Sequence, residues 1–244
     1  MKGSAQLRPE SSSDVVAELR RALAERTKAQ APASQQRAPL STQLSVIDAA
    51  LQGGLPRGRV LEIVGGAGKM AFALLALAAA TQRGELCAFV DADDALDVQT
   101  AARVGVVLER LLWVRTSEAT PEPGQKSSPL RDGMKAVDLL LGAGGFALVI
   151  LYGTRFARGS AVATTAWPRL VQRCEKAGTT LLVAAQQPVA GSFAAVTLEC
   201  AAGEPVWERA PGGRMVLNGQ RTTIEVTRSR LGPPGEIEEL PLRR

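Results

Sequence analysis

The chain has 244 residues, of which 45% are hydrophobic, 4% are aromatic and none is histidine. This length suffices for one sizeable α/β domain with a small N-terminal appendage, and so few aromatic residues indicate a core of Ala, Leu and Val. Without histidine the commonest general base and zinc ligand are missing, and three scattered cysteines show no ligand spacing, so we expect no metal site. The formal net charge of +5 is compatible with nucleic-acid phosphates or an acidic protein as partner, and it proves neither.

Composition also bears on where the protein works. Sparse, unpaired cysteines are typical of a reducing cytosol, and the polar N-terminus does not resemble a secretion signal. The most apolar run, residues 71–80, is shorter than the roughly 20 residues that a membrane span needs. We therefore expect a cytoplasmic protein without a membrane segment.

A short amphipathic helix is predicted near the N-terminus. Ser13 and Asp14 are typical of a helix start, since serine caps the first turn and an acid favours it. Val16, Leu19 and Leu23 follow at helical spacing and form one apolar stripe. The stripe either packs on its own core or forms an interface with another subunit, and the sequence leaves both alternatives open.

The linker after this helix suggests two parts of the chain. Residues 30–39 are rich in Ala, Pro, Gln and Ser, a composition typical of flexible connections. We therefore assign residues 1–38 to the helix and linker, and residues 39–240 to a core domain.

The core alternates between apolar, β-like runs and helical stretches. Strands are predicted at residues 59–64, 86–91, 111–115, 146–152 and 179–185, and helices between them at residues 70–81, 95–105, 132–141 and 161–177. Strand-like runs follow at residues 195–200, 214–217 and 222–228. This order predicts an α/β fold with a mostly parallel sheet, flanking helices and antiparallel edge strands.

The first predicted strand runs into a glycine-rich turn that opens a helix. Gly65, Gly66, Gly68 and Lys69 provide the backbone amides and the cation of an anion site at a helix start. A working phosphate loop has four residues between its glycines, whereas two residues separate Gly65 from Gly68 here. The next residue, Met70, has no hydroxyl to hold Mg²⁺. We therefore favour a strand-to-helix turn over a nucleotide-binding loop.

A second metal-binding element is altered as well. The hydrophobic strand at residues 146–151 is followed by Tyr152, where an aspartate near Mg²⁺ usually stands. A phenol does not replace a carboxylate as a ligand of a hard cation at neutral pH. Together with the short loop, this substitution leads us to expect no catalysis and no bound cofactor.

Several segments in order resemble the core of the RecA recombinases. The run LQGGLPRGRVLEI at residues 51–63 resembles the entry to that core, and FVDADDALD at residues 89–97 resembles the family's FIDAEHALD. The resemblance implies that Asp93 stands in place of the catalytic glutamate, with a shorter reach. It further implies that Gln187 matches a nucleotide-sensing glutamine, and that residues 188–194 form a shortened second DNA-binding loop. Arg228 and Arg230 stand where two lysines contact ATP across the subunit interface.

A RecA-like chain with altered nucleotide motifs and no C-terminal domain is similar to the ImuA family, part of a group that includes the division inhibitor SulA. The resemblance implies a non-catalytic accessory protein of damage-induced (SOS) translesion mutagenesis. Its expected partners are RecA and ImuB, together with an error-prone DnaE-type polymerase, and RecA filaments are a further expected target.

Two alternatives remain at this level. Lys69, Asp93 and the pair Arg228 and Arg230 favour a divergent RecA paralogue with weak ATP-dependent DNA binding. The relation to SulA favours a cell-division inhibitor. Any DNA binding is expected to be weak, salt-sensitive and sequence-independent, and the sequence leaves self-association open.

Overall fold

The computed structural model describes residues 38–66, 68–116, 129–156, 161–201, 203–211, 213–232 and 240–243. The predicted N-terminal helix, with Val16, Leu19 and Leu23, lies outside the described residues. In the described part, no helix is long and apolar enough to cross a membrane.

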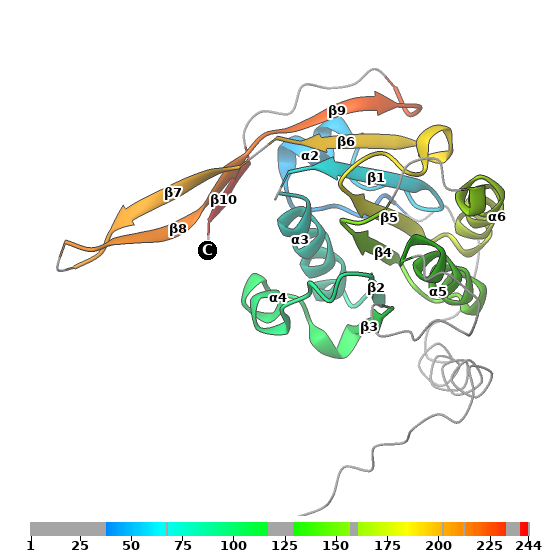
Figure 1. Cartoon of the computed structure of the whole chain (residues 1–244), viewed down its shortest axis with the longest axis horizontal. Coiled ribbons are helices and arrows are strands. Elements are labelled where there is room, and N and C mark those ends of the chain that lie inside the picture. The colour runs from blue at the N-terminus through cyan, green and yellow to red at the C-terminus, as the bar shows by residue number, and fades with distance from the viewer. Residues whose placement is uncertain are drawn as a thin grey trace, which may run out of the picture.

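A seven-stranded sheet forms the centre of the molecule (Figure 1), in the order β3-β2-β4-β5-β1-β6-β9. Its strands are β1 Val60–Gly65, β2 Cys87–Asp91, β3 Leu111–Arg115, β4 Leu148–Gly153, β5 Thr180–Ala185, β6 Val196–Cys200 and β9 Ile224–Ser229. All neighbours run parallel except β9, which is antiparallel to β6. The predicted α/β fold, with its mostly parallel sheet and antiparallel edge, is confirmed.

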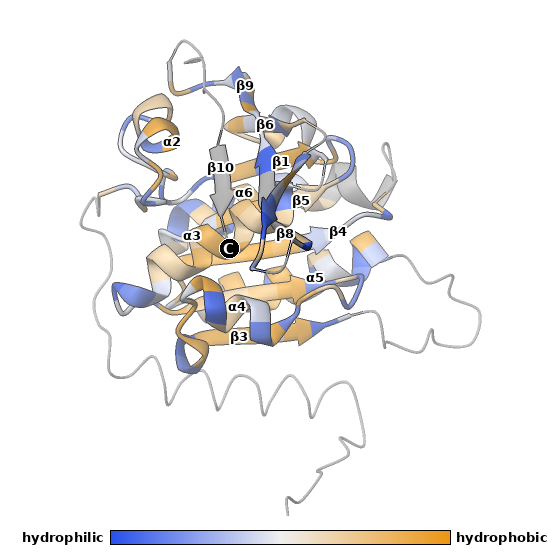
Figure 2. Ribbon diagram, turned by 90° about the vertical axis from the view of Figure 1, so that its left-hand side faces the viewer, coloured by the Kyte–Doolittle hydropathy of each residue, from blue (hydrophilic) through white to orange (hydrophobic). Residues whose placement is uncertain are grey.

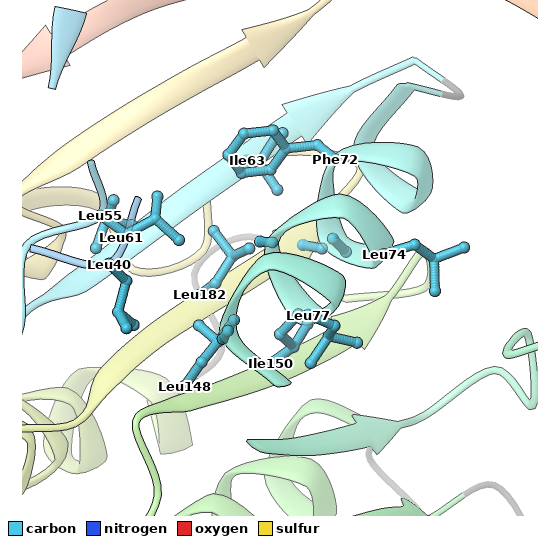
Figure 3. Close-up of a cluster of buried hydrophobic side chains, with 14 of the residues drawn as sticks. Leu40, Leu55, Leu61, Ile63, Phe72, Leu74, Leu77, Leu148, Ile150 and Leu182 are labelled. Carbon is cyan, nitrogen blue, oxygen red and sulfur yellow. The ribbon is translucent and has the colours of Figure 1, made fainter. Parts of the chain in front are cut away.

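Helices cover both faces of the sheet. They are α2 Ser45–Ala50, α3 Gly68–Gln82, α4 Val98–Val104, α5 Pro129–Ala143 and α6 Ala161–Ala177, with 3₁₀ turns at Leu108–Arg110 and Gly191–Phe193. Because side chains alternate along a strand, β1 sends Leu61 and Ile63 into the cluster under α3 and Val60 into the cluster under α5 and α6. Figure 3 shows the first cluster, in which Phe72 and Leu77 of α3 lie over the strands.

Helix α4 begins later than the sequence suggests. The prediction was residues 95–105, whereas the helix begins at Val98. The buried carboxylate of Asp91 accepts hydrogen bonds from three backbone N–H groups of residues 93–96, which holds them in a turn. Asp97 then caps the helix by accepting from two N–H groups of its first turn.

A second sheet corrects the prediction for the C-terminal strands. The run at residues 214–217 lies in β8 (Met215–Thr222), which pairs with β7 (Glu204–Arg209) and β10 (Leu240–Arg243) and not with the central sheet. Among the described strands, β9 alone forms the antiparallel edge of the central sheet, and it alternates buried Ile224 and Val226 with exposed residues. Figure 1 shows β7 and β8 projecting away from the core, and Figure 2 shows hydrophobic residues concentrated in the central strands and α3.

Candidate nucleotide site

The glycine-rich turn joins β1 to α3 and is fastened to β6. Gly65 has φ +92°, and a Cβ there would lie 2.4 Å from the carbonyl oxygen of Cys200, so only glycine fits. The N–H of Gly66 donates to the same Cys200 oxygen at 2.8 Å. One amide that a phosphate loop would offer to its ligand is thus used to hold the turn.

The ammonium of Lys69 is occupied within the protein. The residue is only 4% exposed, and Nζ donates to the carbonyl oxygens of Gly65 at 2.9 Å and Gly66 at 3.2 Å, and to Oε1 of Gln186 at 3.4 Å. Three donors and three acceptors satisfy the group. Burial lowers the pKa of Lys69 and outweighs the opposing effects of Cys200 and Asp93. A phosphate would have to displace these acceptors.

A threonine from the second sheet fills the start of α3. A Cβ placed on Gly68 would lie 2.6 Å from Cγ2 of Thr222, and Thr222 is 2% exposed. The Thr222 hydroxyl donates to the carbonyl of Ala201 at 3.1 Å. A side chain therefore packs at the helix N-terminus, where an anion would otherwise approach the amides.

Asp93 connects the ends of β2 and β4. Its Oδ2 accepts from the backbone N–H of Thr154 at 2.5 Å and from the Thr154 hydroxyl at 2.6 Å, and Oδ1 accepts from Nε of Arg155 at 3.2 Å. Burial raises the pKa of Asp93, but these hydrogen bonds and the charge of Arg155 outweigh burial, so the net pKa is lowered. The carboxylate is thus ionised and engaged by neighbouring residues.

Tyr152 belongs to the core under α3. Its ring stacks on that of Phe89 with centroids 5.8 Å apart and planes at 25°, and the residue is 7% exposed. Burial raises the pKa of the phenol, and the charges of Asp93 and Asp91 raise it further. A neutral, stacked phenol does not offer the anionic oxygen that Mg²⁺ requires.

The residues present do not fit ATP with Mg²⁺. The RecA-like fold implies such a ligand, yet Met70 and Tyr152 stand where a hydroxyl and a carboxylate would bind the metal. Among the described residues, no three or more potential metal ligands come together.

Sequence reasoning missed Glu62, which holds the loop at 188–194. Buried Glu62, in the middle of β1, accepts from the N–H groups of Val189 at 2.6 Å, Ala190 at 2.5 Å and Gly191 at 3.2 Å. Burial raises the pKa of Glu62, although these hydrogen bonds and Arg228 act to lower it. The sequence did contain a signal for this role, because Glu62 is a charged residue within an otherwise apolar predicted strand.

Arg228 fastens the same loop from β9. Its guanidinium donates to the carbonyl oxygen of Gly191 and, at 3.4 Å, to that of Ser192. Arg230 is exposed and donates its backbone N–H to Ala195. We refer to Glu62 and Arg228 as the loop clamp, because together they hold both amides and carbonyls of residues 188–194.

The predicted site residues fall into two separate groups. Gly65, Gly66, Gly68, Lys69, Asp93 and Tyr152 lie at or near the carboxyl ends of β1, β2 and β4. Arg228 pairs with Thr197, whereas Gly65 pairs with Cys200, three residues further along β6. The two arginines are thus not brought to the Lys69 turn within one chain. Gln186, the residue before the Gln187 that the resemblance matches to a nucleotide-sensing glutamine, contacts Lys69.

The fold and the turn together define a RecA-like α/β core. The solved structure of the RadB recombinase has the same fold, with a TM-score of 0.59 and 18% identity, over 84% of this chain and 95% of that one. Residues 27–128 match the family of RecA N-terminal domains.

Several curated relatives are RecA proteins. Protein RecA of Arthrobacter sp. (strain FB24) is 37% identical over 121 residues, which are 47% of this chain and 31% of the relative. Protein RecA of Acidiphilium cryptum (strain JF-5) is 42% identical over 108 residues, 42% of this chain and 30% of the relative. The chain thus spans about three tenths of the length of these relatives. A RecA-like relationship is supported.

Proposed function

We propose that this chain is a non-catalytic RecA-like accessory protein of damage-induced translesion mutagenesis, as in the ImuA family. One observation carries the proposal. The two charged groups expected to handle nucleotide, Lys69 and Asp93, are each engaged by neighbouring protein groups. Charged groups engaged in this way stabilise the fold at the carboxyl ends of the strands and are not free to bind a nucleotide. The protein therefore acts through contacts with partner proteins.

The proposed partners are RecA and ImuB, with an error-prone DnaE-type polymerase, in the cytoplasm. A chain with the RecA-like core but without a working nucleotide turn would join RecA subunits and modulate their filaments. The loop clamp supports the same view, because a shortened loop held by Glu62 and Arg228 does not adapt to DNA as a free loop would.

We expect no ATP hydrolysis above background, with or without single-stranded DNA. The reason is that Met70 and Tyr152 provide neither metal-binding group, and Lys69 is already satisfied. Steady-state phosphate release by the full chain is the measurement, with Lys69→Ala as the matched control. Turnover that Lys69→Ala abolishes would contradict the proposal.

A divergent RecA paralogue that still binds ATP is the second candidate. It is favoured because the Asp93 carboxylate lies close enough to Lys69 to oppose the lowering of the Lys69 pKa by burial, so a lysine and a carboxylate lie near each other here. Titration calorimetry with ATP and Mg²⁺ separates the two candidates. Binding heat that Lys69→Ala removes supports the paralogue, and its absence supports the accessory protein. A SulA-type inhibitor would instead cause filamentation of cells on overexpression.

A further inference from the structure

In the part of the chain that the structure describes, no third strand pairs with the distal half of the hairpin of β7 and β8, which we call the arm. Strand β10 pairs with β8 only from Gly219 to Thr222, whereas Trp207–Arg209 and Met215–Leu217 pair only with each other. The chain reverses through a turn in which the N–H of Ala210 donates to the Arg214 carbonyl at 2.8 Å. A two-stranded ribbon is only marginally stable in water by itself. Large apolar side chains exposed together on such a ribbon therefore indicate a binding surface.

The arm nevertheless carries most of the large hydrophobic residues that the described part of the chain exposes. Trp207 and Met215 are each 55% exposed and Val216 is 44% exposed. Directly opposed residues of an antiparallel pair share a face, as do residues two apart along a strand. Because Arg209 pairs with Met215, one face of the arm presents Trp207, Arg209 and Met215 together.

Charge on the arm selects the kind of ligand. Arg209 and Arg214 are exposed, and neither forms an ion pair with any residue that the structure describes. Glu208 is one residue from Arg209, and Arg214 is one residue from Met215, so both lie on the face opposite Trp207 and Arg209. On the other face, the flat Trp207 ring lies beside the Arg209 guanidinium, which has no ion pair among the described residues, and this combination suits a ligand with stacked planar rings and negative charge.

We propose that the arm binds single-stranded nucleic acid, with a base stacked on Trp207 and a phosphate paired with Arg209. Aromatic platforms flanked by cationic side chains bind single strands without sequence preference. A second copy of the chain suits the face less well, because it would bring cationic arms together in a chain of net charge +5. The site lies outside the loop at 188–194 and needs no nucleotide.

The experiment uses the full chain, without ATP, and a labelled oligothymidylate. The oligonucleotide is longer than a typical single-strand binding site, which covers about 4–16 nucleotides. Anisotropy gives the affinity, and quenching of tryptophan fluorescence reports stacking. Trp113 is partly buried and Trp167 is 1% exposed, so quenching comes mainly from Trp207. Thermal unfolding checks that each variant keeps its core.

We expect Trp207→Ala to weaken binding roughly 5- to 150-fold and to remove the quenching. Arg209→Gln should lower the slope of log affinity against log salt by about 0.7, whereas Arg214→Gln, on the opposite face, should lower it less. Glu208→Gln should strengthen binding, because it removes a negative charge from the arm. Arg103→Gln, which removes the same charge from α4, is the matched control and should show neither the large loss of affinity nor the loss of quenching.

Two results overturn the proposal. One is that the parent chain does not bind the oligonucleotide, or that Trp207→Ala and Arg209→Gln bind as the parent does. The other is that the arm variants change only the sedimentation of the chain, which would assign the arm to a protein partner or a second copy. Neither result bears on ATP hydrolysis, so this test and that of the proposed function fail independently.

Discussion

Protonation of Asp93 should destabilise the folded protein, because the charged carboxylate accepts hydrogen bonds from its neighbours. Its pKa lies below the ordinary value of 3.8 because, despite burial, Thr154 and Arg155 favour the charged form. A carboxyl whose folded-state pKa is depressed contributes stability above the unfolded pKa, and this contribution is lost as pH falls through the folded pKa. The protein should therefore lose unfolding free energy on acidification below about pH 4.

We predict that Asp93→Asn lowers the unfolding free energy at neutral pH by about 1–3 kcal/mol and flattens its decline in acid. Denaturant unfolding at pH values from neutral to strongly acidic is the measurement. Asp94→Asn is the matched control, because Asp94 is exposed and its ion pair with Arg115 is long at 3.5 Å. An unchanged acid limb in Asp93→Asn would show that the carboxylate has another role.

At the scale of an element, the loop clamp determines the behaviour of residues 188–194. Glu62 is fully buried and provides all the acceptors for three consecutive N–H groups. Replacing a buried acceptor leaves its donors unsatisfied, at about 1–3 kcal/mol for each unsatisfied group.

We predict that Glu62→Gln speeds hydrogen exchange at Val189, Ala190 and Gly191 by at least about tenfold, because the amide cannot accept at both positions. Arg228→Gln should loosen the same segment less, since carbonyl oxygens find water more readily. Glu199→Gln, at an exposed position on β6, is the control. Equal exchange in Glu62→Gln and the parent would show that packing alone holds the loop.

At the scale of the whole molecule, the N-terminal segment is the predicted means of association. Val16, Leu19 and Leu23 form one stripe at helical spacing, and burying each of them contributes roughly 1.5–3 kcal/mol. The cost of ordering helix and linker reduces this gain. We therefore expect the stripe to contact a RecA-like subunit, either a second copy or RecA itself.

We predict that Leu19→Glu combined with Leu23→Glu leaves the core folded and abolishes association. Co-purification with RecA and sedimentation of the chain alone are the measurements. Ala17→Glu with Arg21→Glu adds two acids away from the stripe and should behave as the parent does. If the double leucine variant also binds and sediments unchanged, the helix packs on its own core.

The sequence by itself determined the fold class and the residue types that stand at the glycine-rich turn and at the end of the fourth strand. Alternation of apolar runs with helices predicted the parallel sheet, because the period of hydrophobic residues is a local property. The missing hydroxyl at Met70 and the missing carboxylate at Tyr152 are matters of residue identity, which needs no coordinates.

Tertiary structure alone decided which buried hydrogen-bond donors and acceptors pair with one another. Lys69 and Gln186 are 117 residues apart, and Glu62 meets Ala190 across 128 residues. Pairing over such distances depends on strand order, and no local pattern encodes it. The arm was not predicted for the same reason. The sequence of β8 has the local pattern of a strand, but strand pairing in the folded chain placed β8 outside the central sheet and left Trp207 exposed.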